Sequence, residues 1–241
     1  MTNMELQQYQ KKNLLSNGKT NTKTAKNEIK TFILYLAPHT KNSKGFNICV
    51  HASKGCINAC LETAGMGIFS NVQKARIEKS NYFVEYRKEF LNHLAKEINT
   101  KVKTARRKGE KIAFRLNGTS DLDFVYLLKK HANFDILGTK DVAIYYDYTP
   151  NIHRALRYKN HPLYTLTFSR KEDNGKETKI ALENNINTAV VFNKLPKTWN
   201  GKKVIDGDKS DLEMIKHKDV ILGLIAKGKA KKDTSNFVVT I

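Results

Sequence analysis

The chain has 241 residues, of which 40% are hydrophobic and 27% charged, a composition that can bury the core of one globular domain. No apolar run approaches the ~20 residues of a membrane span, and the polar N-terminus lacks the apolar core of a signal peptide. The formal net charge of +20 favours contact with polyanions. We therefore expect a cytoplasmic protein that makes no contact with membranes, and its oligomeric state is not readable.

The N-terminal segment, residues 1–30, is rich in Asn, Thr, Lys and Gln and has few large apolar residues. Such a composition predicts a polar, basic arm that is mobile or loosely docked. The apolar run Phe32–Ala37 follows and is ended by Pro38. This run predicts the first strand of a single domain over residues 31–241.

All three cysteines lie in one short window with the spacing C-x6-C-x3-C: Cys49, Cys56 and Cys60. An odd number of cysteines cannot form a closed set of disulfides within one chain. Three thiolates that converge on one point can instead hold a metal. An iron–sulfur cluster of the 4Fe-4S type would use the three cysteines and leave one iron open. The alternatives are zinc, with His51 as the fourth ligand, or reduced thiols with no metal.

A long helical pattern follows over residues 71–108, with one apolar stripe that predicts a buried face. From residue 111 onward, strand patterns alternate with short helical patterns, which predicts a parallel sheet. About seven strands favour an α/β fold with a complete or partial TIM-like barrel, and an open doubly wound sheet is the alternative. Strands are expected at 32–37, 111–116, 142–148, 163–168, 188–192, 203–205 and 220–226, and the shorter helices at 122–131, 151–159 and 176–185.

Polar residues follow most of these predicted strands, where parallel strands form sites. Arginines at such positions suit phosphate or carboxylate, and aspartates suit acid–base catalysis. The structural alternative is that these residues form turns and helix caps. We expect catalysis from Asp121, Asp147 and Asp208, and substrate binding from Arg115, Asn117, Ser120, Tyr146, Arg170, Asn193 and Lys227.

Two further stretches concentrate positive charge and are candidates for phosphate-backbone contacts. They contain Lys101, Lys103, Arg106, Arg107 and Lys108 in the first stretch, and Lys229, Lys231 and Lys232 in the second. The alternative is a set of solvated surface lysines. We expect nucleic acid as the partner, without a choice between DNA and RNA.

Several segments resemble the phage and plasmid family called gene product 88-like, over about residues 32–240. The resemblance rests on Cys49, Ser53–Cys60, Gly65–Gly67, Asn71–Arg76, Asn117–Asp121, Tyr146–Thr149, Gly207–Asp211 and Gly223–Ala230. It implies a mobile-element protein with a three-cysteine iron–sulfur site on a barrel-like fold, and brings no reaction with it. Where the family pattern often has Pro after the first cysteine, this chain has Val50-His51.

Radical enzymes that use S-adenosylmethionine also combine three cysteines with a parallel barrel, so that cofactor enters as a further expectation. Their usual C-x3-C-x2-C spacing is absent here. The sequence therefore predicts a phage or plasmid metalloprotein that modifies or processes nucleic acid. Its rivals are a non-catalytic nucleic-acid-binding protein with a structural metal site, and a barrel that acts on a small metabolite.

Overall fold

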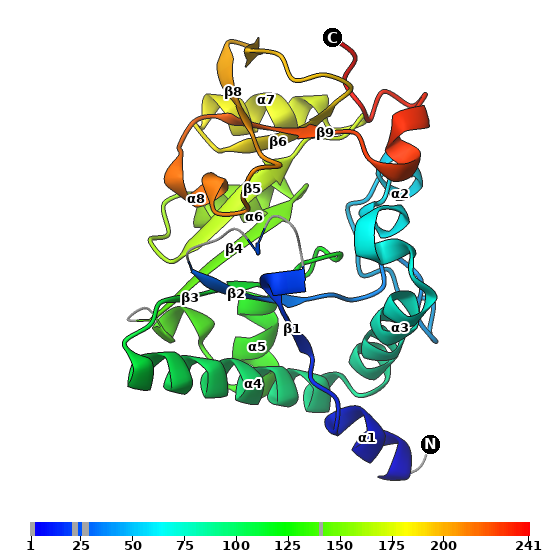
Figure 1. The fold of residues 1–241 in the computed structure, drawn as a ribbon, viewed down its shortest axis with the longest axis vertical. Helices are drawn as coiled ribbons and strands as arrows, with labels where there is room; N and C mark the ends of the chain where they lie inside the picture. The colour runs from blue at the N-terminus through cyan, green and yellow to red at the C-terminus, as the bar shows by residue number, and fades with distance from the viewer. Residues whose placement is uncertain (1–2, 21–23, 26–28, 140–141) are drawn as a thin grey trace. The chain divides into compact units, whose positions relative to one another are not determined.

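The computed structural model describes residues 3–20, 24–25, 29–139 and 142–241 (Figure 1). These residues form two compact units. Of the described residues, the first unit contains 3–18, 29–50, 69–139 and 142–145, and the second contains 19–20, 24–25, 51–68 and 146–241.

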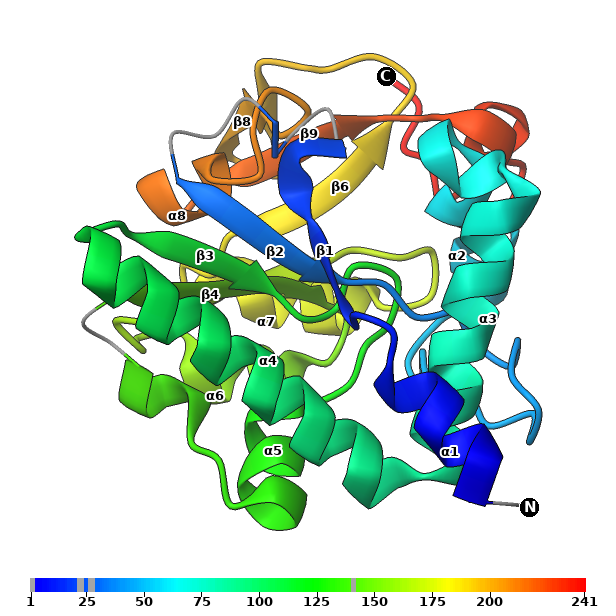
Figure 2. The same ribbon diagram turned by 60° about the horizontal axis from the view of Figure 1, so that its bottom comes forward.

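The first unit contains four neighbouring strands, in the order β1-β2-β3-β4. β1 is antiparallel to β2, and the other pairs are parallel. Helix α4 runs along one side of β2 and β3 (Figures 1 and 2). The elements are α1 (Asn3–Gln10), β1 (Leu15–Asn17), β2 (Lys30–Leu34), α3 (Ser70–Glu85), α4 (Arg87–Lys108), β3 (Ile112–Arg115), α5 (Phe124–Ala132), η4 (Ile136–Thr139) and the start of β4 (Ala143–Thr149).

The helical pattern over residues 71–108 forms two helices, α3 and α4, instead of one. The break is at Tyr86, whose φ of −129° and ψ of 58° lie outside the helical region. The predicted apolar stripe is buried on both sides of the break, with Phe83, Phe90 and Ile98 at most 1% exposed. Gly109, with φ 64°, caps α4 in the left-handed conformation.

The N-terminal segment, expected as an arm, contributes a helix and a strand to the first unit. Tyr9 of α1 stacks on Tyr82 of α3 at a centroid distance of 5.0 Å. Leu14 is 1% exposed, and the N–H groups of Leu14 and Leu15 donate to Glu97 of α4. The basic residues Lys23 and Lys26 of this segment lie outside the described residues.

The second unit contains strands in the order β4-β5-β6-β9-β8-β7. β6, β9 and β8 are parallel neighbours, and β7 forms an antiparallel hairpin with β8. Helix α7 contacts both β5 and β6. The elements are η1 (Gly18–Thr20), α2 (Lys54–Asn58), η2 (Leu61–Thr63), η3 (Gly65–Ile68), α6 (Ile152–Tyr158), β5 (Tyr164–Ser169), α7 (Gly175–Glu183), β6 (Thr188–Phe192), β7 (Thr198–Trp199), β8 (Lys202–Asp206), α8 (Glu213–Lys216), β9 (Ile221–Ile225) and η5 (Gly228–Lys232).

The prediction of an α/β fold built mainly from parallel strands is confirmed. β6 covers residues 188–192, as the apolar run predicts, and its Val190 and Phe192 are fully buried. Within the described residues, the strands of neither unit close on themselves into a complete barrel. Antiparallel edges at β1 and β7 end the run of parallel strands.

Candidate functional site

Two of the three cysteines lie in what we call the cysteine segment, residues 53–68 of the second unit. It begins at Ser53, whose hydroxyl accepts the N–H of Cys56 at 3.1 Å and so caps α2. Glu172, which follows β5, accepts two hydrogen bonds at the start of α2. Its carboxylate accepts the Ser53 hydroxyl and the Gly55 N–H, each at 2.7 Å. A short helix that could not persist alone is thereby held by a carboxylate from a distant part of the chain.

Gly55 is required at this position because the chain passes very close to its neighbours. A Cβ on this residue would lie 2.7 Å from the Glu172 carboxyl carbon and closer still to the Ser235 hydroxyl. At such separations either the helix or the two side chains would have to move. The glycine therefore allows Glu172 to reach the backbone of α2.

Of the cysteines of this segment, Cys56 lies within α2 and Cys60 lies just beyond its C-cap. Cys56 and Cys60 are both half-buried. Between them, Ala59 is 7% exposed and packs with Ala226 and Ala230 in one apolar cluster. The packing fixes the backbone that carries both thiols.

Cys49 belongs to the first unit, in the segment before α3. Its sulfur accepts the His39 N–H at 3.4 Å and donates to the Thr119 carbonyl at 3.6 Å. It too is half-buried. Half-buried thiols are soft donors, the donor type that suits an iron–sulfur cluster or zinc. Within the described residues, the structure shows no group of three or more His, Cys, Asp or Glu side chains arranged to hold a metal ion.

His51, the alternative zinc ligand, is exposed and lies in the second unit. Its Nε2 is 3.0 Å from Nδ2 of Asn151, the residue that caps α6. Asn151 also accepts the N–H of Arg154 through its Oδ1. The imidazole therefore has a polar neighbour on α6.

The predicted strand-end residues of the first unit build a turn. Asn117 is 3% exposed, accepts the Leu122 N–H and the Ser120 hydroxyl, and donates to the Leu122 carbonyl. Asp121 donates its N–H to the Ile48 carbonyl, next to Cys49. Arg115 is half-buried at the end of β3. The structure thus brings Asn117 and Ser120 together, and their hydrogen bonds stabilise this turn.

In the second unit, several predicted residues have structural partners. Asp208 accepts the Ile225 N–H at 3.0 Å and the Lys227 ammonium at 2.8 Å, so two predicted residues form one ion pair. Asn193 accepts the N–H of Ile241 and thereby fixes the C-terminal segment. Arg170 fixes the same segment by donating Nη1 to two of its carbonyls.

Tyr146 and Asp147 are consecutive in β4 and almost fully buried. The Tyr146 hydroxyl donates to Asp211 at 3.4 Å, and Asp147 accepts the Tyr164 hydroxyl at 3.2 Å. Because neighbours in a strand point to opposite faces of the sheet, these two bonds lie on different faces.

The predicted basic residues are largely exposed. On α4, the exposed ones are Lys103, Arg106, Arg107 and Lys108, whereas Lys101 is half-buried with its ammonium 5.4 Å from the Phe32 ring centroid. In the second unit, Lys229, Lys231 and Lys232 are exposed on η5.

The basic residues of η5 lie beside the cysteine segment, as Figure 1 shows for the red and cyan segments. Ala230 of η5 and Ala59 share one apolar cluster. The Lys229 N–H donates to the Thr63 hydroxyl, and Gly228, with φ 54°, passes within contact distance of Thr63. A Cβ at Gly228 would lie 2.6 Å from the Thr63 carbonyl oxygen, so this contact also requires glycine. The cysteine segment and η5 are therefore packed neighbours within one unit.

Two residues of this unit were not found from the sequence. Glu172 could not be found from the sequence, because its partners lie more than 100 positions away in the chain. Trp199 could have been found, since the Asn200-Gly201 pair directly after it is a strong hairpin signal.

None of the described helices has the length and hydrophobicity that crossing a bilayer requires. Searches of curated proteins and of solved structures find no match. The family model described as gene product 88 matches residues 6–241, which is nearly the whole chain and includes all three cysteines. The chain belongs to the gene product 88 family.

Proposed function

We propose that this chain is a phage or plasmid metalloprotein that carries an iron–sulfur cluster and modifies or processes nucleic acid. The observation that supports it most is the packing of the cysteine segment against η5, a segment that carries three exposed lysines. Cys56 and Cys60 would be ligands from this unit, and Cys49 would be the third, as its spacing in the sequence implies. A cluster bound in this way would supply redox or Lewis-acid chemistry.

The residues around the thiols suit this role. Glu172 and Ser53 hold the start of α2, so Cys56 is presented on a fixed backbone. Lys229, Lys231 and Lys232 would bind the phosphate backbone of the substrate and keep it near the cysteine segment. The net charge of +20 would increase the rate at which a polyanion is captured.

A second candidate is a non-catalytic nucleic-acid-binding protein with a structural metal site. The observation that favours it is the use of Asn117, Asp208 and Asn193 in bonds that stabilise the chain. In this candidate the metal fixes the loop, and loss of the metal lowers stability. Zinc with His51 is the matching metal assignment.

Anaerobic purification followed by metal and sulfide analysis tests the metal centre. We expect iron and acid-labile sulfide with a visible absorption band, and loss of nearly all of both in Cys56→Ala, because a cluster held by three thiolates does not survive with two. Asn58→Ala is the matched control, since Asn58 is exposed on the same helix. Zinc without sulfide would favour the second candidate, and a wild-type protein without metal would refute both.

Binding to duplex DNA and to RNA at several salt concentrations tests the partner. The slope of log K against log salt is negative. We expect Lys231→Ala/Lys232→Ala to reduce its magnitude by about 0.9 for each duplex phosphate that the variant no longer neutralises. The control is Lys194→Ala/Lys218→Ala, which removes the same charge from two other exposed positions of the second unit. Equal slopes in the two double variants would show that η5 does not contact the phosphates.

A further inference from the structure

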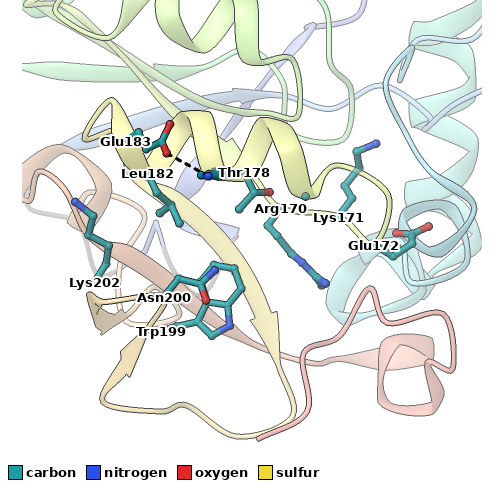
Figure 3. Close-up of a pocket in the computed structure, with 11 residues that line it drawn as sticks. Arg170, Lys171, Glu172, Thr178, Leu182, Glu183, Trp199, Asn200 and Lys202 are labelled. Atoms are coloured by element: carbon teal, nitrogen blue, oxygen red, sulfur yellow. Dashed lines mark ion pairs between the residues drawn. The ribbon is translucent and has the colours of Figure 1, made fainter.

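The second unit contains a groove between α7 and the β7–β8 hairpin, with a volume of about 620 Å³ (Figure 3). This volume is within the range of about 300–1,000 Å³ typical of ligand sites. One face of α7 forms the first wall, through Thr178, Lys179 and Leu182. The hairpin forms the other wall with Trp199, and Arg170 extends into the same space.

Trp199 stands on a tight hairpin. The turn consists of Asn200 and Gly201, with φ of 45° and 76°, the left-handed pair typical of a two-residue type I′ turn. Trp199 pairs with Lys202 across the hairpin, so their side chains lie on the same side of it. A turn of this kind leaves the indole little freedom to move away from the groove.

The indole is half-buried and rests on the core of the unit. Its ring meets Phe192 edge-on, with centroids 6.2 Å apart and an interplanar angle of 78°. Leu182 packs against the same apolar cluster from α7. Among the described residues, no hydrogen bond involves the indole N–H. The groove therefore has an aromatic and aliphatic floor with one available donor.

Cations lie beside this floor, together with the carboxylates of Glu172 and Glu183. Arg170 is fixed by donating Nη1 to the carbonyls of Asn236, at 2.6 Å, and Phe237, at 2.8 Å, and these bonds do not use Nη2 or Nε. Burial lowers the pKa of Arg170, opposed by the nearby Glu172, but a guanidinium remains charged at neutral pH. Lys179 is 79% exposed, and its ammonium lies 3.8 Å from the Glu183 carboxylate, a weak surface pair.

We propose that this groove binds a nucleotide unit, with the base stacked on Trp199 and the phosphate held by Arg170 and Lys179. The inference rests on the nucleic-acid half of the proposed function and names the site that would hold one unit of the substrate. An aromatic floor next to a fixed arginine and an exposed lysine is a combination that suits both single-stranded nucleic acid and free nucleotides. Loss of the stacking ring is expected to weaken binding about 5- to 100-fold.

Trp199 is the only tryptophan in the chain, so the intrinsic tryptophan fluorescence reports on this groove alone. The probes are AMP, ribose 5-phosphate as the baseless control, and ten-nucleotide DNA and RNA strands. We expect saturable quenching by the probes that carry a base and little response to ribose 5-phosphate. An oligonucleotide that binds more tightly than AMP identifies a strand as the ligand, and the reverse order identifies a free nucleotide. No response to any base, or an equal response to ribose 5-phosphate, overturns the proposal.

Matched variants of α7 test the phosphate contact. Lys179→Ala should weaken the quenching titration by roughly 2- to 5-fold. Lys176→Ala removes the same charge from an exposed position of the same helix that does not line the groove, and should leave the titration unchanged. Equal effects of the two variants would overturn the phosphate assignment.

Calorimetric titration of Trp199→Leu, with its fold checked by circular dichroism, tests stacking without a fluorescent reporter. Nucleotide binding at wild-type affinity in this variant would overturn the site. The two proposals fail differently. Salt-dependent binding of long duplexes without quenching overturns the groove alone, whereas quenching by AMP without any binding of DNA or RNA overturns the nucleic-acid function and leaves a mononucleotide site.

Discussion

Replacing Glu172 with Gln is expected to remove most of the iron of the proposed cluster although all three thiols remain. The carboxylate accepts two donors, the Ser53 hydroxyl and the Gly55 N–H, each at 2.7 Å. A glutamine is uncharged and offers only one acceptor oxygen, so both charge-assisted bonds are lost and the Ser53 hydroxyl would have to rotate to accept from the NH₂ group. Hydrogen bonds to a charged group contribute about 1.5–3 kcal/mol each. A five-residue helix that loses this support should no longer hold Cys56 in place.

The measurement is iron and sulfide per protein after anaerobic purification, together with the urea midpoint of unfolding. The matched control is Glu177→Gln, which makes the same change in the first turn of α7. We expect the control to keep wild-type iron and the Glu172 variant to keep a cooperative transition. Wild-type iron content in Glu172→Gln would show that the carboxylate does not position the cysteine segment.

The alternation of strands and helices could be predicted because each element carries its own periodicity. The apolar run at residues 188–192 is short, β-branched and bounded by polar residues, and it forms β6 with the same bounds. The break at Tyr86 could not be predicted, because residues 71–108 contain neither glycine nor proline. The apolar stripe continues through the break, so the pattern reads as one helix.

The candidate site was predictable only where residue type alone carries the chemistry. Three cysteines in one window are a candidate metal site from residue type and spacing alone, whereas Glu172 is an ordinary acidic residue until the fold brings it to Gly55. Conversely, Asn117 and Asp208 follow strands as site residues do, yet both satisfy backbone N–H groups of nearby loops and strands. Such bonds are required wherever a buried chain leaves a sheet, so polarity at strand ends alone does not identify a catalytic residue.

Replacing Glu97 with Gln is expected to destabilise the first unit by about 2 kcal/mol at pH 7 and to flatten its acid unfolding. Glu97 is 12% exposed and accepts the N–H groups of Leu14, at 2.6 Å, and Leu15, at 3.0 Å. His93 lies 3.2 Å from the same carboxylate, and the ammonium of Lys79 binds the Leu14 carbonyl. Burial alone would raise the pKa of Glu97. The hydrogen bonds from His93, Leu14 and Leu15 outweigh the effect of burial, so the pKa is lowered.

A carboxyl group whose pKa is lower in the folded state than its usual value of 4.5 stabilises the fold above that value. The stabilisation is lost as the pH falls through the lower, folded-state pKa. Urea unfolding between pH 7 and pH 3 should therefore show the wild type approaching Glu97→Gln as the pH falls. Glu110→Gln, an exposed change just after α4, is the control and should follow the wild type. A constant difference in the free energy of unfolding between wild type and Glu97→Gln across this range would mean that the carboxylate charge does not stabilise the start of β1.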